Sequence, residues 1–140
     1  MVFLCFLVRQ LKPWHENISK RQVKAPKLYF RDSGLLHLQL GLRTHDEVLG
    51  HPRLGASWEG FAMEQLMSQA RAHSDELHFW RTQHGAELDL LWVRGGRKIG
   101  FEFKRTTSPS VTPSMRAALE DLKLDHLFVV HAGQHEFSLG

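Results

Sequence analysis

Apolar side chains recur along the second half of the chain with periods that predict alternating helices and strands. Between residues 55 and 72 they recur at helical spacing, which predicts a long amphipathic helix. Three β-prone runs follow at 76–81, 86–93 and 98–104. Gly95 and Gly96 separate the last two runs, and a glycine pair between two β-prone runs is a strong hairpin signal.

The pattern continues with one more helix and one more strand. Pro113 and the capping residue Thr112 predict a helix over 113–122, and residues 126–130 form a short apolar run typical of a strand. The order from residue 55 is therefore α-β-β-β-α-β, a mixed α/β domain in which the helix before the last strand is a crossover.

The first part of the chain is less regular. Residues 3–11 are predicted to form a strand that ends at the segment 13–17, and residues 28–30 form a second short strand. Asp32 and Ser33 are a capping pair for a helix over 34–40, which Gly41 closes. The polar connector 43–54 predicts a division into an extension, 1–45, and a main domain, 46–140. Ser57 would cap the long helix if that helix began late.

Length and composition fit one compact domain with an appendage. The chain has 140 residues, 42% of them hydrophobic, and its single cysteine, Cys5, excludes a disulfide framework and favours a reducing cytoplasm. The apolar run 1–8 is too short to span a bilayer, so no membrane association is expected. Ten histidines are scattered without the spacing of structural zinc sites.

Positive charge is concentrated near the N-terminus. Residues 9–31 hold seven basic side chains and one acid, a net +6, so the remainder carries −3 of the total +3. Such a segment could follow a phosphate backbone, or it could be a solvated extension or a face that meets a partner. The candidate nucleic-acid contacts are Lys20, Arg21, Lys24, Lys27 and Arg105.

Charged residues also alternate with apolar ones along the predicted hairpin. Glu87 and Asp89 lie on its first strand, and Glu102 and Lys104 lie on its second. Because side chains alternate between the faces of a strand, both polar pairs can share one face, where three carboxylates and one ammonium would converge.

This convergence has two interpretations. Mg²⁺ or Mn²⁺ prefers carboxylate oxygens, so Asp89 and Glu102 are candidate ligands of a catalytic cation, with Lys104 stabilising charge and positioning water. Alternatively, the residues form an ordinary cross-strand ion pair on a half-exposed sheet. The apolar residues around them favour a covered sheet, where unpaired charges are costly.

The stretches "GASWEGF", "GAELDLL" and "GFEFK" together resemble the PD-(D/E)XK nuclease superfamily. With "KAPKLYFRDSGLL" and "PSMRAALEDL", the chain from about residue 7 onward is similar to a C-terminal domain of unknown function found in many bacterial and archaeal AAA+ ATPases. The resemblance implies a restriction-endonuclease-like core, a mixed central sheet flanked by helices, preceded by an N-terminal strand and basic extension.

The resemblance also implies a ligand set. Asp89 corresponds to the strand acid, Glu102 and Lys104 to the Glu-x-Lys pair, and Glu59 to the helical acid, which makes Glu59 a third metal ligand. Glu64, one turn away, is a second candidate or a surface residue. The proline before the strand acid is missing, and Asp32 is interpreted as a helix cap.

Three functions remain open: a divalent-metal-dependent DNA nuclease, a non-catalytic module that binds nucleic acid or docks onto an ATPase, and a structural domain. The chain contains no Gly-x-x-x-x-Gly-Lys-Ser/Thr loop, so it is expected to be a fragment or a shortened relative that does not hydrolyse ATP. The expected partners are DNA, the ATPase module and a second copy bound through the N-terminal strand.

Overall fold

A computed structural model describes residues 6–16 and 25–139 of the chain. Backbone contacts group the chain into two units, one of residues 1–10 and 28–71 and the other of residues 11–27 and 72–140. The division into 1–45 and 46–140 stays a prediction. No helix within the described ranges is long and apolar enough to cross a lipid bilayer.

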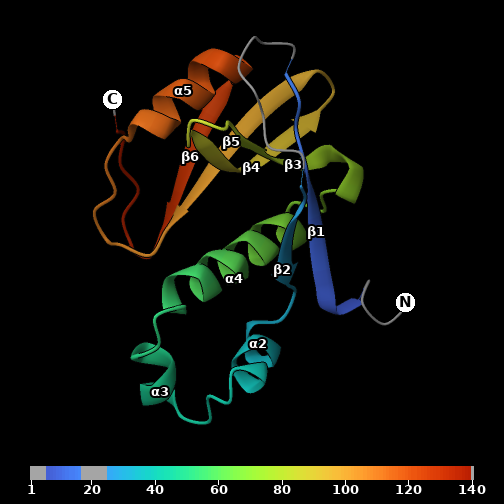
Figure 1. The fold of residues 1–140 in the computed structure, drawn as a ribbon. Coiled ribbons are helices and arrows are strands. Elements are labelled where there is room, and N and C mark those ends of the chain that lie inside the picture. The colour runs from blue at the N-terminus through green and yellow to red at the C-terminus, as the bar shows by residue number, and fades with distance from the viewer. Residues whose placement is uncertain (1–5, 17–24, 140) are drawn as a thin grey trace. The chain divides into compact units, whose positions relative to one another are not determined.

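Six strands form one mixed sheet in the described part of the chain (Figure 1). They are β1 (Val8–Pro13), β2 (Lys27–Phe30), β3 (Leu77–Arg81), β4 (Glu87–Arg94), β5 (Arg97–Lys104) and β6 (His126–His131), in the spatial order β2-β1-β3-β4-β5-β6. The four helices of these residues are α2 (Ser33–Gln39), α3 (His45–Leu49), α4 (Leu54–Gln69) and α5 (Pro113–Leu122), and a 3₁₀ turn, η1 (Ser74–Glu76), precedes β3. The mixed α/β class and the predicted element order after residue 54 are therefore confirmed.

The N-terminal strand differs from its prediction. Phe6 and Leu7 are helical and the strand runs from Val8 to Pro13, while residues 3–5 lie outside the described ranges. Proline can end this strand because the ladder bond to β3 is donated by the next residue, the Trp14 N–H to the Phe79 carbonyl at 2.7 Å, so no N–H from Pro13 is needed. Since β1 lies between β2 and β3, it does not offer the open edge on which the predicted pairing with a second copy depended.

Helix boundaries in the first unit follow local capping signals. The predicted Asp32 cap of α2 is confirmed, since its side chain accepts the Leu35 N–H at 3.0 Å. Helix α3 was not predicted, although Thr44 and Glu47 form a reciprocal capping box at its start. Ser57 is not a cap, because α4 begins at Leu54 and places Ser57 in its interior.

A hairpin and a crossover organise the second unit. Gly95 and Gly96 join β4 to β5 with φ angles of 58° and 79°, the left-handed conformations that a two-residue hairpin turn requires. After β5, helix α5 returns the chain to β6, which runs parallel to β5 as predicted. The buried side chains of Trp80, Leu88, Leu91, Ala118 and Leu122 form the core between α5 and the sheet.

Candidate functional site

Asp89 lies where β4 departs from regular pairing. The residue pairs of β4 with β5 run from Leu90 opposite Phe101 to Arg94 opposite Arg97, so Asp89 precedes the first pair. Leu88 and Leu91 belong to the same core cluster, although strict alternation would place them on opposite faces. At this irregular point the Phe103 N–H donates a hydrogen bond to the Asp89 carboxylate at 3.0 Å, and the carboxylate takes the place of a backbone carbonyl acceptor.

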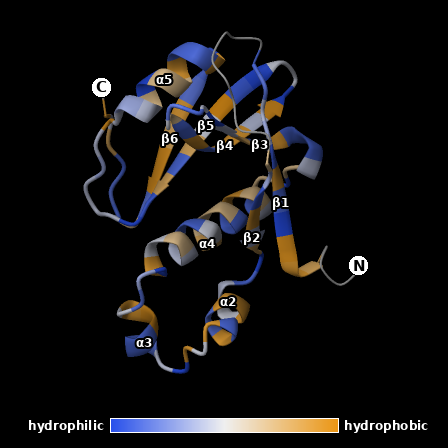
Figure 2. Cartoon of the chain, in the orientation of Figure 1, coloured by the Kyte–Doolittle hydropathy of each residue, from blue (hydrophilic) through white to orange (hydrophobic). Residues whose placement is uncertain are grey.

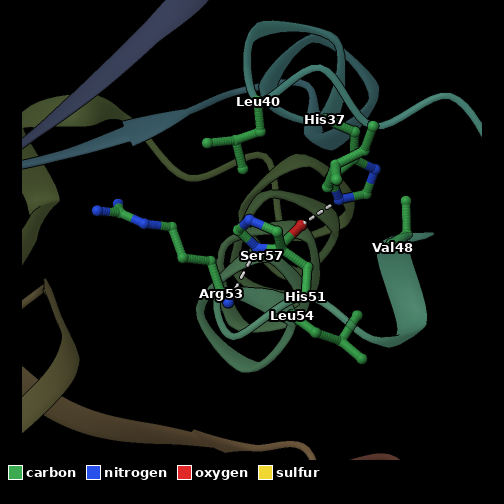
Figure 3. A pocket seen from close by; sticks show the side chains of 8 residues that line it. His37, Leu40, Val48, His51, Arg53, Leu54 and Ser57 are labelled. Carbon is green, nitrogen blue, oxygen red and sulfur yellow. Dashed lines mark hydrogen bonds between the residues drawn. The ribbon is translucent and has the colours of Figure 1, made fainter.

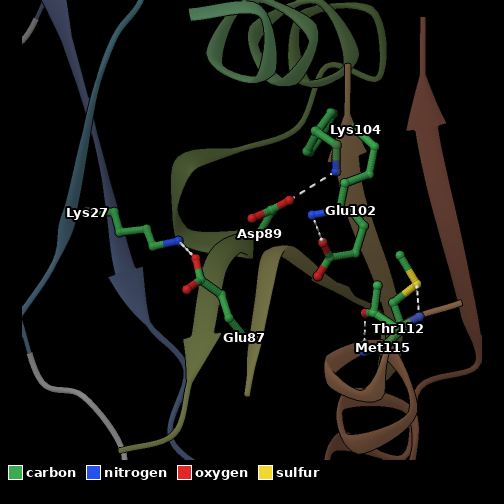
Figure 4. Close-up of polar contacts among 8 residues, drawn as sticks. Lys27, Glu87, Asp89, Glu102, Lys104, Thr112 and Met115 are labelled. Carbon is green, nitrogen blue, oxygen red and sulfur yellow. Dashed lines mark hydrogen bonds and ion pairs between the residues drawn. The ribbon is translucent and has the colours of Figure 1, made fainter. Parts of the chain in front are cut away.

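Glu102 lies on β5, a strand with neighbours on both sides. It lies opposite Val129 of β6 and is only 4% exposed. Lys104, two residues further along the same strand, places its Nζ 3.3 Å from Glu102 Oε2 (Figure 4). The Lys104 side chain is 39% exposed and the Glu102 side chain 5%, so the ammonium is the solvent-facing member of the pair.

The surroundings of Glu102 disfavour its ionised form. Burial, the negative charge of Asp89 and a hydrogen bond with Asp89 raise the pKa of Glu102 to about 8, and the Lys104 charge offsets only part of this rise. Two carboxyl groups in contact cannot both ionise at low cost unless a cation or a proton lies between them. One positive charge held between the two carboxyl groups, either a proton or a bound cation, would therefore stabilise the pair.

Glu87 does not join this pair. Its carboxylate forms ion pairs with Lys27 Nζ and with Arg81 Nε, the latter at 3.4 Å (Figure 4). Three converging carboxylates were expected from alternation, but the structure brings two together, because the irregular stretch of β4 changes the direction of its side chains. Within residues 6–16 and 25–139, no group of three His, Cys, Asp or Glu side chains is arranged to hold a metal ion.

Helix α4 carries both acids that are candidates for the helical ligand. Glu59 is half-buried on α4, in the first unit, and its place in the ligand set stays a prediction. Glu64 is 8% exposed, so it is not the surface residue that was one alternative. Both Glu64 oxygens accept hydrogen bonds from Arg9, and the Arg31 Nε lies 3.7 Å away. These contacts give Glu64 a structural role.

The candidate nucleic-acid contacts are in different environments. Lys20, Arg21 and Lys24 lie outside the described residues. Lys27 is paired with Glu87, and its Nζ lies 5.1 Å from the centre of the Phe79 ring, so its charge is already engaged. Arg105 is exposed just after β5. Their contact with nucleic acid stays a prediction.

A second polar cluster, in the first unit, was not predicted. His37 Nε2 lies 2.7 Å from Ser57 Oγ, which joins α2 to α4 beside a small pocket (Figure 3). Ser57 is 6% exposed, so this hydrogen bond satisfies a buried hydroxyl. The two residues are 20 positions apart, and no local sequence pattern connects them.

The fold and the site define a mixed α/β domain in which two adjacent strands carry a half-buried aspartate, a buried glutamate and a lysine. Residues 54–140 match the family described as Domain of unknown function (DUF4143), which is more than half of the chain. The protein therefore belongs to the DUF4143 family. Residues 4–46 match a second family, Domain of unknown function (DUF8612).

Two mycobacterial proteins are similar to nearly the whole chain. Uncharacterized protein Mb2031c of Mycobacterium bovis and Uncharacterized protein Rv2008c of Mycobacterium tuberculosis are each 52% identical over 133 residues, which is 95% of this chain. The chain spans about 30% of the length of these relatives. No solved structure matches the chain.

Proposed function

We propose that this domain hydrolyses DNA phosphodiester bonds with a bound divalent cation, Mg²⁺ or Mn²⁺. The observation that carries the proposal is the interaction of the half-buried Asp89 carboxylate with the buried Glu102 carboxyl group, beside the Lys104 ammonium. Magnesium commonly takes one or two protein carboxylates and completes its shell with water and phosphate oxygens, so two carboxylates are sufficient. A cation would also relieve the repulsion that raises the pKa of Glu102.

Each residue has a distinct role in this proposal. Asp89 and Glu102 would hold the cation, which when bound polarises a phosphoryl oxygen and acidifies a water molecule. Lys104 would stabilise the negative charge that develops on the phosphoryl group and orient the attacking water. The water oxygen forms a bond to phosphorus while one P–O ester bond breaks, leaving a phosphate monoester and a hydroxyl end.

The resemblance to PD-(D/E)XK nucleases supports this assignment. It supplies the restriction-endonuclease-like description of the fold, the role of Glu59 as a third ligand, and DNA as the substrate. The similarity to C-terminal domains of AAA+ ATPases further suggests that the domain works beside an ATPase module. The greater length of the mycobacterial relatives leaves room for such a module in proteins of this kind.

A cleavage assay with metal titration tests the proposal. We expect nicking or cutting of plasmid or branched DNA with Mg²⁺ or Mn²⁺ but not with EDTA, and calorimetry should detect cation binding. Asp89→Ala should lose both activities, while Glu120→Gln, which removes an exposed carboxylate of α5, should keep both. Cleavage that survives in Asp89→Ala would refute the proposed site.

A second function is a module that keeps the fold and binds nucleic acid, or docks onto an ATPase, without cleavage. The lack of a third metal-ligating side chain beside Asp89 and Glu102 in the described residues favours it. The basic segment would then supply the affinity, which should fall steeply with salt. Salt-sensitive DNA binding by both the parent protein and Asp89→Ala, with no cleavage by either, would support this function over the nuclease.

A further inference from the structure

Strand β6 forms an end of the sheet. Its one neighbour among the described residues is β5, so its other backbone edge has no strand beside it (Figure 1). Natural edge strands usually carry lysines, other charges, prolines or bulges that prevent further pairing. The sequence His-Leu-Phe-Val-Val-His of residues 126–131 has none of these charged residues or prolines. Figure 2 shows β6 as a largely hydrophobic strand.

The direction of the backbone groups identifies the residues on the open edge. The Asp125 N–H donates to the Lys98 carbonyl at 2.8 Å, so it points toward β5. Because N–H groups alternate in direction along a strand, those of residues 127, 129 and 131 also point toward β5. The N–H and C=O groups of His126, Phe128 and Val130 therefore point away from the sheet.

The side chain at the middle of this edge is apolar and accessible. Phe128 is 50% exposed, and its ring stacks on Phe101 with the ring centres 5.6 Å apart. The stacking fixes the ring against the sheet while leaving much of it in contact with water. An exposed aromatic beside unpaired backbone groups is the arrangement that strand addition covers.

We infer that β6 pairs antiparallel with β6 of a second copy of the chain, centred on Phe128. In this register Phe128 lies opposite Phe128, and His126 lies opposite Val130. The pairs of residues 126, 128 and 130 then join residues whose backbone groups point outward, which gives about six hydrogen bonds across the two-fold axis. Leu127 lies opposite Val129, and no like charges meet at neutral pH.

The second copy is the occupant that this edge fits best. A two-fold interface must be complementary to itself, and a neutral strand with an aromatic residue at its centre meets that condition. An acidic or basic partner strand would find no opposite charge on residues 126–131. The inference is independent of the proposed nuclease function, because it uses the edge of the sheet and not its carboxylates.

Sedimentation velocity on the full chain, from about 1 to 100 μM, tests the pairing. We expect a monomer–dimer equilibrium that Phe128→Lys weakens at least about tenfold, because it removes the aromatic contact and sets like charges opposite each other. Phe61→Lys is the matched control, since Phe61 is also a phenylalanine, 49% exposed, on α4. This control should leave the equilibrium unchanged.

Two further variants separate pairing from misfolding. Phe128→Lys and Phe128→Glu should each be monomeric alone, and their mixture should form heterodimers, which damage to the fold could not produce. Val130→Pro removes an outward N–H and spares the bonds to β5, so it should abolish the dimer while circular dichroism stays native. A parent that is monomeric at every concentration, or a dimer that Phe128→Lys does not weaken, would overturn the inference.

Discussion

Glu102 combines deep burial with a carboxylate neighbour, and this combination sets how stability depends on pH. Its pKa is raised to about 8 in the folded protein, against an ordinary value of 4.5. Between these values the folded state binds more protons than the unfolded state, so stability decreases as pH rises. In EDTA we expect the free energy of unfolding to fall from pH 5 to pH 8. Each unit of pKa difference is worth about 1.4 kcal/mol, and the total should be on the order of a few kcal/mol.

Glu102→Gln should remove this dependence. The amide cannot ionise, so the variant should be more stable than the parent at pH 8 and should show a flatter pH profile in urea unfolding. Glu120→Gln, on the exposed side of α5, should keep the slope of the parent. A parent profile that is flat or rises over this range would show that Glu102 is ionised in the folded protein without penalty.

The pair of Arg9 and Glu64 shows the opposite case, a buried acid whose charge is matched. Their side chains are 14% and 10% exposed and share two hydrogen bonds. Removing one partner of a buried pair leaves an uncompensated charge, so Arg9→Met should cost about 3 kcal/mol, less any help from Arg31. The double variant Arg9→Met/Glu64→Leu should recover most of this loss in urea unfolding, and a loss equal to the single variant's would contradict the explanation.

Among the elements, helix α5 is bounded by a stabilising N-cap, Thr112, and a destabilising C-cap, Lys123. Thr112 Oγ1 accepts the Met115 N–H at 3.3 Å, so Thr112→Ala should cost about 1 kcal/mol.

Lys123 closes the helix in the left-handed region with φ of 52°, a conformation that costs a non-glycine residue about 1 kcal/mol. Lys123→Gly should therefore stabilise the protein by a similar amount in thermal unfolding. Lys123→Ala controls for loss of charge and should give no such gain.

The sequence predicted the elements whose ends carry local signals. The hairpin at Gly95 and the helix from Pro113 to Leu122 match their predictions because turn glycines, the N1 proline and the cap act within a few residues. Helix α3 was missed because five residues are too few to show apolar periodicity, although its capping box was visible.

The candidate site was predictable only in part. Alternation suggested that Asp89 and Glu102 could share one face, and in the structure their interaction contributes to the raised pKa of Glu102. The irregular stretch of β4, which leaves Glu87 with Lys27, depends on how Leu88 and Leu91 pack against α5. The contact between Arg9 and Glu64 joins residues 55 positions apart. Neither this contact nor the irregular stretch of β4 could be predicted from a local sequence pattern.

At the scale of the whole molecule, cation binding should couple to unfolding. A ligand that binds only the folded state stabilises it by about 2.7 kcal/mol at a hundred times its dissociation constant. In calorimetry, Mn²⁺ should therefore raise the unfolding temperature of the parent protein, because Asp89 and Glu102 lie on paired strands that separate when the sheet unfolds. Asp89→Ala should abolish this shift.

The same measurement decides whether Glu59 is a ligand. Glu59 belongs to the first unit, whereas Asp89 and Glu102 belong to the second. If Glu59 is a ligand, its replacement removes a carboxylate oxygen from the cation and weakens binding. Glu59→Gln would then reduce the rise in unfolding temperature that Mn²⁺ causes. If Glu59 takes no part, Glu59→Gln leaves the rise in unfolding temperature unchanged, and the cation must be held by the strand carboxylates without it.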